Sequence, residues 1–409
     1  MLRVFSKETR ISQKDFFMII LLFNIFEWFY MMSSWINSVL NSPNLTYTQN
    51  LLIWATYYTA IIGSSIVGSI LSKRISRINF LYLWMVMGIV TSLSPVLLSN
   101  FTLIHILIIC ILLGASFGVG MPSGLAYFAE CTLVENRGLI SGIILLTTNL
   151  IASFFAIVFT MFNLTVYLMI FVAWKAFGLI LFFLMPKEKN ASETKKDFSF
   201  ISILHDKNFF LYFIAWFMFC LIDGFEWPIL REFLADFHSF TIIIGPIIGS
   251  FSAFVAGLLC DLVGRKRMVL YGFVTLGITY AVMGIAPATS VSWFFYLAFG
   301  SISTGILWVT FILILWGDLS QSGAGEKYYV IGEIPFFLTG IVQLLAAPYV
   351  MLIPVTRAFS LAAFFLFLAV LPLLYAPETL PEKKIELRQL KKYIEKAKEV
   401  KEKYAETTE

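Results

Sequence analysis

Long apolar runs, each about the length of a membrane-spanning helix, follow one another along almost the whole chain, separated by short polar turns. A backbone in hydrocarbon must satisfy its own hydrogen bonds, so such runs form helices. The pattern therefore predicts an all-α membrane protein with twelve transmembrane helices. The predicted spans are 16–40, 50–71, 80–98, 101–129, 138–162, 164–185, 208–232, 239–259, 268–287, 291–317, 328–353 and 357–376.

Composition agrees with this pattern. Hydrophobic residues make up 59% of the 409 residues, charged residues only 13%, and the mean hydropathy is +0.86. A soluble domain carries about 25% charged residues, so this chain has too few to form a polar surface. The first apolar run follows Arg3, Lys7, Arg10 and Lys14 and is too long for a signal-peptide core, so we expect it to be retained.

The placement of basic residues predicts the orientation. All of the 29 lysines and arginines except Lys175, Arg231 and Arg357 lie in the N-terminal segment, the C-terminal tail or the loops on one side of the spans. Such loops face the cytoplasm. We therefore expect a multi-pass protein of the plasma membrane with both termini cytoplasmic. The net charge of +4 reflects this bias and does not indicate nucleic-acid binding.

A polar segment divides the spans into two groups of six. The expected organisation is an N-terminal six-helix bundle (1–185), a cytoplasmic linker (186–207), a C-terminal six-helix bundle (208–376) and a cytoplasmic tail (377–409). The tail has the apolar spacing of an amphipathic helix, which would lie on the inner leaflet or remain solvated.

Weak internal sequence repeats favour a duplication of the six-span unit. Gly68 near the end of span two matches Gly257 near the end of span eight, and Glu130 at the end of span four matches Asp318 after span ten at almost the same separation. Many transporters are built from two such halves related by pseudo-symmetry. The repeats therefore predict two pseudo-symmetric six-helix bundles.

The loop after span eight contains Gly257, Asp261, Gly264 and Arg265 with the spacing Gly-x-x-x-Asp-x-x-Gly-Arg. This motif resembles the signature loop of the major facilitator superfamily. Physically, Gly257 permits close helix packing, Gly264 permits a tight turn, and Asp261 can bind arginines or a helix N-terminus. The resemblance implies a conformational lock at this loop, and pseudo-symmetry would place Asp261 near Gly138 at the start of span five.

The first-half copy of this loop differs, because Ser72 stands at the aspartate position and Ile75 at the second glycine. After span four, Glu130 and Arg137 resemble the superfamily's Glu…Arg-Gly segment and join the expected lock. The chain then leaves the last span at Pro377-Glu378-Thr379, which is similar to the Pro-Glu-Thr sequence of sugar-porter-like members.

Span one carries Asn24, Glu27 and Trp28, which resemble the Asn-x-x-Glu-Trp stretch of metabolite:proton symporters, although Tyr30 replaces that subfamily's aspartate. A charged group inside hydrocarbon costs about 2.5–3.5 kcal/mol, so it is expected to face a partner or a water-filled cavity. The candidate substrate or proton-binding residues are Asn24, Glu27, Lys175, Asp223, Glu226 and Glu333.

Structural alternatives remain open for these residues. Glu27 could hold span one to a neighbouring helix, and Lys175 could form an ion pair or extend its ammonium group to an interface. A Glu226–Arg231 contact would leave Asp223 as the freer carboxylate. The four cysteines and three histidines show no metal-ligand spacing, and no phosphate loop or Gly-x-Ser-x-Gly motif occurs. We therefore expect no metal, no cofactor and no enzymatic activity.

These expectations combine into one function. The chain resembles a monomeric secondary active transporter that moves a small organic solute (an organic acid, a sugar or an amino-acid-like metabolite) through the lipid bilayer by alternating access, coupled to protons by symport. The alternatives are a proton-driven exporter of drugs or metabolites and a non-transporting scaffold or sensor built on a transporter fold.

Overall fold

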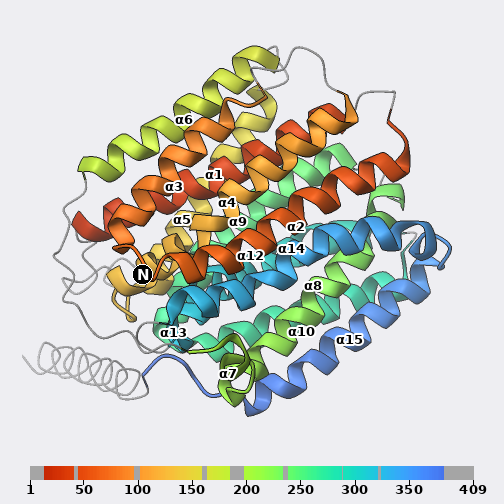
Figure 1. Cartoon of the computed structure of the whole chain (residues 1–409). Coiled ribbons are helices and arrows are strands. Elements are labelled where there is room, and N and C mark those ends of the chain that lie inside the picture. Colours follow the sequence, from red (N-terminus) through yellow and green to blue (C-terminus); the bar gives the residue numbers. More distant parts are fainter. Residues whose placement is uncertain are drawn as a thin grey trace, which may run out of the picture.

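The computed structural model describes residues 13–40, 45–95, 102–158, 164–184, 198–233, 238–287, 289–320 and 324–381. Within these ranges the chain forms helices and turns without a strand. The long helices run side by side as one bundle (Figure 1). Those of the first half are α1 (Gln13–Leu40), α2 (Tyr47–Leu71), α3 (Arg77–Ser92), α4 (Leu103–Cys131), α5 (Arg137–Val158) and α6 (Leu164–Leu184). Those of the second half are α8 (Lys207–Phe233), α9 (His238–Val263), α10 (Arg265–Ile285), α11 to α13 (Ser290–Leu319), α14 (Gly325–Val350) and α15 (Val355–Tyr375).

Eleven helices in the described ranges are long and apolar enough to cross a membrane. The remaining apolar helix, α3, is shorter and occupies the place of the third predicted span. The tenth predicted span is continuous but not uniformly α-helical. It contains α11 (Ser290–Phe295), the π-helical segment η3 (Tyr296–Gly300), α12 (Ser301–Trp308), a second π-helical segment η4 (Val309–Leu315) and α13 (Trp316–Leu319). Single π-helical turns often mark functional sites.

The two halves meet chiefly along two pairs of helices. Helix α5 packs against α9, and α2 packs against α14, which crosses the front of the bundle beside it in Figure 1. Small residues permit the first contact. A Cβ atom on Gly257 would lie 3.1 Å from Gly142 Cα and would also collide with the carbonyl oxygen of Gly138. Glycine at these positions therefore allows the two backbones to touch.

Gly264 makes the turn between α9 and α10 with a φ of +116°, which explains the second glycine of the signature motif. The Glu378 carboxylate accepts hydrogen bonds from the backbone nitrogens of Arg265, at 2.8 Å, and Lys266, at 3.2 Å. Glu378 thus satisfies free N–H groups in the first turn of α10. The Pro-Glu-Thr sequence is therefore folded back onto the start of this helix.

Three expectations fall wholly or partly outside the described residues. They concern the amphipathic tail beyond residue 381, most of the 186–207 linker, and the side chain of Arg231. The described part of the linker includes a short helix, α7 (Phe200–Leu204), whose first turn is capped by Ser199.

Candidate functional site

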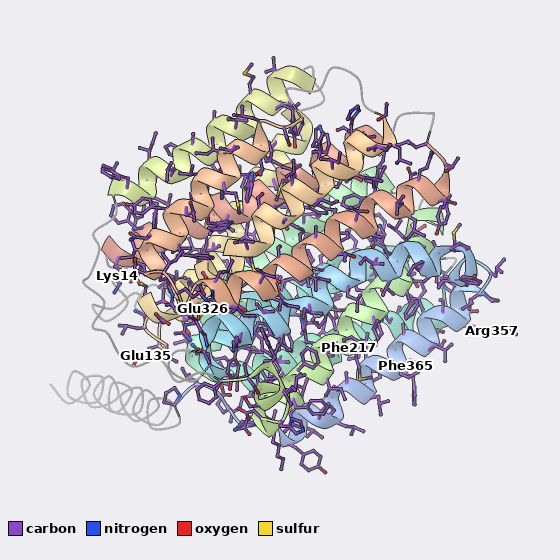
Figure 2. The ribbon with its side chains drawn as sticks, viewed as in Figure 1. Lys14, Glu135, Phe217, Glu326, Arg357 and Phe365 are labelled. Atoms are coloured by element: carbon purple, nitrogen blue, oxygen red, sulfur yellow. The ribbon has the colours of Figure 1, made fainter. Side chains whose placement is uncertain are left out.

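Charged side chains from both halves meet at one end of the bundle, which we name the charged end. Figure 2 places Glu326 there, on the side of Lys14 and Glu135, whereas Arg357 lies at the opposite end. The charged end is defined by Arg77, Glu130, Arg137, Asp261, Arg265, Asp318 and Glu326.

Arg77 connects the halves on one side of this end. Its Nη2 lies 2.5 Å from Glu326 Oε1, its Nε donates to the same oxygen at 3.0 Å, and its Nη1 pairs with Glu130. The Arg77 and Glu326 side chains are each only 2% exposed, whereas that of Glu130 is 51% exposed. The Arg77–Glu326 contact is therefore the buried part of this cluster.

Asp318 connects the halves on the other side. Its carboxylate pairs with Arg137 of the first half and receives a hydrogen bond from Arg265 Nε of the second half at 3.1 Å. Thr379 Oγ1 adds a hydrogen bond at 3.2 Å. The Asp318 side chain is completely buried, and two arginines compensate for its burial.

Asp261 binds the N-terminus of α5. Its two carboxylate oxygens accept hydrogen bonds from the backbone nitrogens of Gly138, at 3.0 Å, and Leu139, at 2.8 Å, and one of them lies 2.9 Å from Arg265 Nη2. The structure therefore places Asp261 where pseudo-symmetry predicted. A carboxylate is favoured there because the helix N-terminus carries a partial positive charge.

A cavity of about 450 Å³, here called the central cavity, lies between the halves. Its lining comes from α1, α5, α8, α9 and the η3–α12 region. On α5 and α9 the lining residues are those remote from Arg137 and Asp261, so the cavity lies towards the end opposite the charged end. Its polar and aromatic lining includes Tyr30, Ser34, Asn149, Ser153, Asp223, Glu226, Trp227, Thr241, Tyr296, Ser301, Thr304 and Trp308.

Asp223 and Glu226 bring two carboxyl groups to this cavity from one turn of α8. Glu226 is 5% exposed, and its Oε1 has no hydrogen-bond partner among the described residues. The phenol of Tyr296 lies close to it. On the facing wall, Tyr30 donates a hydrogen bond of 3.1 Å to Asn149 Oδ1.

Glu333 lines a smaller space of about 40 Å³ that extends the central cavity towards the middle of the bundle. The two spaces share Tyr30, Leu145 and Trp308. Glu333 is 3% exposed, and its Oε1 finds no hydrogen-bond partner within the described part of the chain, although the Trp316 indole lies nearby. No lysine, arginine or histidine occurs among the described residues that line the two spaces.

Asn24 and Glu27 lie inside the first half. Asn24 Nδ2 donates to the carbonyl oxygen of Trp174 at 2.8 Å, and its side chain packs on Gly178, so it joins α1 to α6. Glu27 is 1% exposed, and its Oε2 lacks a hydrogen bond to any described residue. Glu27 lines neither the central cavity nor its extension, although Tyr30, one turn further along α1, lines both.

Lys175 is enclosed by aromatic rings within the same half. Its ammonium nitrogen lies 3.9 Å from the ring centroid of Trp28 and 4.4 Å from that of Trp84, and the side chain is completely buried. The indoles are fixed because Trp28 donates to Ser92 Oγ at 3.0 Å and Trp84 to the carbonyl oxygen of Ser116 at 2.6 Å. Cation–π attraction therefore supports the ammonium group.

The structure thus separates the candidate residues into two groups. Asp223, Glu226 and Glu333 reach the cavity system, whereas Asn24, Glu27 and Lys175 lie among helices of the first half. Sequence reasoning did not select Arg77 and Glu326, which lie at the ends of spans where charged residues are ordinary. Arg77 could have been found as the counterpart of Arg265, because each arginine follows one copy of the signature loop and begins a helix.

The sequence matches no protein-family model, and no curated protein matches it. Solved structures of other proteins are similar to this chain in fold. The human organic anion transporter MFSD10 (TETRAN) is 12% identical with a TM-score of 0.63, and the match covers 88% of this chain and 100% of that one. The proton:xylose symporter XylE, bound to 6-bromo-6-deoxy-D-glucose, is 15% identical with a TM-score of 0.66, and the match covers 90% and 97%. The chain therefore has the fold of the major facilitator superfamily, of which XylE is a member.

Proposed function

We propose that the chain is a secondary active transporter that moves a small organic solute by alternating access and couples this movement to protons. One observation carries the proposal. The cavity system between the halves presents three carboxyl groups, those of Asp223, Glu226 and Glu333, and buried ion pairs hold the halves together at the charged end. This arrangement corresponds to one of the two states that alternating access requires.

The solute is a neutral or cationic molecule, such as a sugar or an amine-bearing metabolite. The ionisable side chains of the described cavity lining are acidic or phenolic, which disfavours an organic anion. Hydroxyl and amide groups near Trp227 and Trp308 suit a molecule with both polar and apolar faces. Xylose, the solute named for XylE, belongs to the neutral class.

The carboxyl groups supply the coupling. Within the described lining no cation opposes Glu226 or Glu333, and a buried carboxylate without a cation favours its neutral form. In the proposed cycle these groups take up a proton when the cavity closes around them. Exposure to the other side of the membrane then releases it. Import by symport follows if solute and proton are released together. A structural scaffold would have no need of several such groups at membrane depth.

Proton-driven export is the second candidate. The observation that favours it is the combination of Glu226 with the aromatic residues Trp227 and Tyr296, which suits an organic cation. A proton arriving at Glu226 would displace that cation. In symport the proton and the solute move in the same direction, whereas in this mechanism they move in opposite directions.

The basic loops support an orientation with both termini in the cytoplasm of a plasma-membrane protein. In this orientation the charged end is cytoplasmic and the central cavity faces outward. An impermeant thiol reagent added to intact cells should fail to label a cysteine at position 192 in the linker. Efficient labelling from outside would reverse the orientation.

Transport in proteoliposomes tests the proposal. Sugars, amines, amino acids and organic acids are supplied with and without an inward proton gradient, and internal pH is followed with a trapped dye. Glu226→Gln and Glu333→Gln are expected to abolish gradient-driven accumulation but to retain counterflow exchange, because exchange needs no net proton release. Glu27→Gln is the matched variant outside the cavity lining. Loss of coupling in Glu27→Gln alone would move the coupling site into the first half, and absence of any solute-dependent proton flux would reject proton coupling.

A further inference from the structure

A second cavity, which we name the lateral pocket, lies on the outer flank of the second half. It has a volume of about 270 Å³ and is bounded by α8, the end of α14 and α15. Every lining residue is apolar except Glu226. Phe225 is 44% exposed, Leu361 53% and Phe365 43%, and Figure 2 shows Phe365 on the outside of the bundle. Exposed apolar side chains on a spanning helix face lipid, so the pocket opens towards the bilayer.

Helix α8 separates this pocket from the central cavity. Ile222, Phe225 and Ile229 line the lateral pocket, whereas Asp223 lines the central cavity from the next face of the helix. Residues three and four apart share a helix face, and Glu226 stands on the border between the two faces. Glu226 is the residue common to the linings of both cavities.

We propose that the lateral pocket is a binding site for a single-chain amphiphile with a protonated amine. The aliphatic chain lies in the pocket and the ammonium group binds Glu226. Because Glu226 lines both cavities, an amphiphile bound to its carboxyl group excludes a cation bound from the central cavity. The inference rests on the proposed function only for this competition, and binding itself requires no transport.

The chemistry selects an amine. A chain that already lies in lipid gains little by entering an apolar pocket, since lipid tails are equally apolar. Binding must therefore come from the head group. Glu226 is 5% exposed and its Oε1 is without a hydrogen-bond partner in the described ranges, so an ammonium group that reaches this oxygen gains a charge-assisted bond. An alcohol would bind more weakly, and a carboxylate would be repelled.

Photocrosslinking of the full chain in nanodiscs tests binding. The probe is dodecylamine with a diazirine in its chain, compared with the alcohol and the carboxylic acid of the same chain. The amine should label peptides of α8 and α15 in preference to the other two probes. Ala362→Trp fills the lateral pocket, whereas Leu371→Trp adds the same indole at an exposed position of α15 outside the pocket lining. Only Ala362→Trp should abolish labelling.

Glu226→Gln should weaken labelling on the order of tenfold, the effect of losing a charged hydrogen-bond partner. Equal labelling by amine and alcohol, or unchanged labelling of Ala362→Trp, would overturn the site. Dodecylamine should also inhibit solute uptake by the unmodified protein but not by Ala362→Trp, and equal inhibition of both would overturn the competition. Specific labelling in a protein without proton-coupled uptake would reject the proposed function while leaving this site intact.

Discussion

Arg77 at the start of α3 donates two hydrogen bonds to Glu326 at the start of α14 and so ties the two halves together. On the opposite side of the same end, Asp261 of the second half binds the start of α5. The first-half counterpart of Asp261 is Ser72, whose hydroxyl donates only locally, to the carbonyl oxygen of Ser69 at 3.2 Å. The Arg77–Glu326 pair therefore supplies a contact between the halves on the side where the signature aspartate is missing.

Breaking this pair should open the charged end. We predict that Glu326→Gln destabilises the closed arrangement by about 1.5–3 kcal/mol, the value of a hydrogen bond between charged groups. Ala126 reports the opening, because it is only 1% exposed and is covered by the start of α14. A Cβ atom added to Gly325 would lie 3.2 Å from the Cβ atom of Ala126. The measurement is the labelling rate of Ala126→Cys after replacement of the four native cysteines.

Glu130→Gln is the matched control, since it removes the exposed partner of the same arginine. Exposed ion pairs contribute about 0–1 kcal/mol, so labelling should rise much less than in Glu326→Gln. Equal labelling rates in the two variants would show that burial of Glu326 does not determine closure.

Asp261→Asn should also weaken closure. The asparagine amide retains one acceptor oxygen but turns its NH₂ group towards a backbone N–H of α5. The substitution also removes the negative charge that faces Arg265. We expect a shift of about 1–2 kcal/mol, the larger value reported for a charge at a helix end, with normal folded yield. Ser72→Ala at the equivalent position should leave the Ala126→Cys labelling rate unchanged. An unaltered rate in Asp261→Asn would remove Asp261 from the lock.

Gly257→Ala should separate α5 from α9. The added methyl group would meet the backbone of Gly138 and Gly142, neither of which can move without shifting a helix. Overpacking of this kind costs about 1–3 kcal/mol, which should appear as a lower unfolding temperature and a faster Ala126→Cys labelling rate. Gly63→Ala is the control, because nothing lies within 4 Å of its added Cβ. That variant should be neutral or slightly stabilising, as expected for alanine in a helix.

The Lys175 enclosure predicts a coupling between lysine and tryptophan. Trp28→Leu should destabilise the protein more when Lys175 is present than in a Lys175→Met background, because only the ammonium group requires the ring face. The expected difference is about 1–2 kcal/mol for a desolvated cation–π pair. Thermal unfolding of the four proteins in one detergent measures it. Additive effects would mean that Trp28 acts through packing alone.

Transport assays of the Lys175→Met variant separate a structural role of Lys175 from a role in transport. If the lysine only fills the enclosure, Lys175→Met should keep both accumulation and exchange, and its stability should be equal or higher because a buried charge has been removed. Loss of transport in a well-folded Lys175→Met protein would instead return Lys175 to the substrate-binding set.

The sequence by itself determined the spans and much of the charged end. Hydrocarbon requires continuous apolar helices, so local hydropathy predicts where the spans lie. The eleven long helices and α3 lie at the predicted positions. A short motif indicates Asp261, and pseudo-symmetry predicts its place beside Gly138, where the structure has it. Both signals are local or repeated in the chain, and no knowledge of helix packing is needed to read them.

Only the tertiary structure decided which buried charges share a cavity. Glu27 and Glu226 are both acidic residues within spans, yet Glu226 lines two cavities and Glu27 lies among helices of the first half, away from the central cavity and its extension. In a chain this apolar, the lipid face and the packed face of a helix have nearly the same composition, so periodicity does not reveal which side faces which neighbour. The direction of each carboxyl group follows from the rotation of its helix, which packing against neighbouring helices fixes.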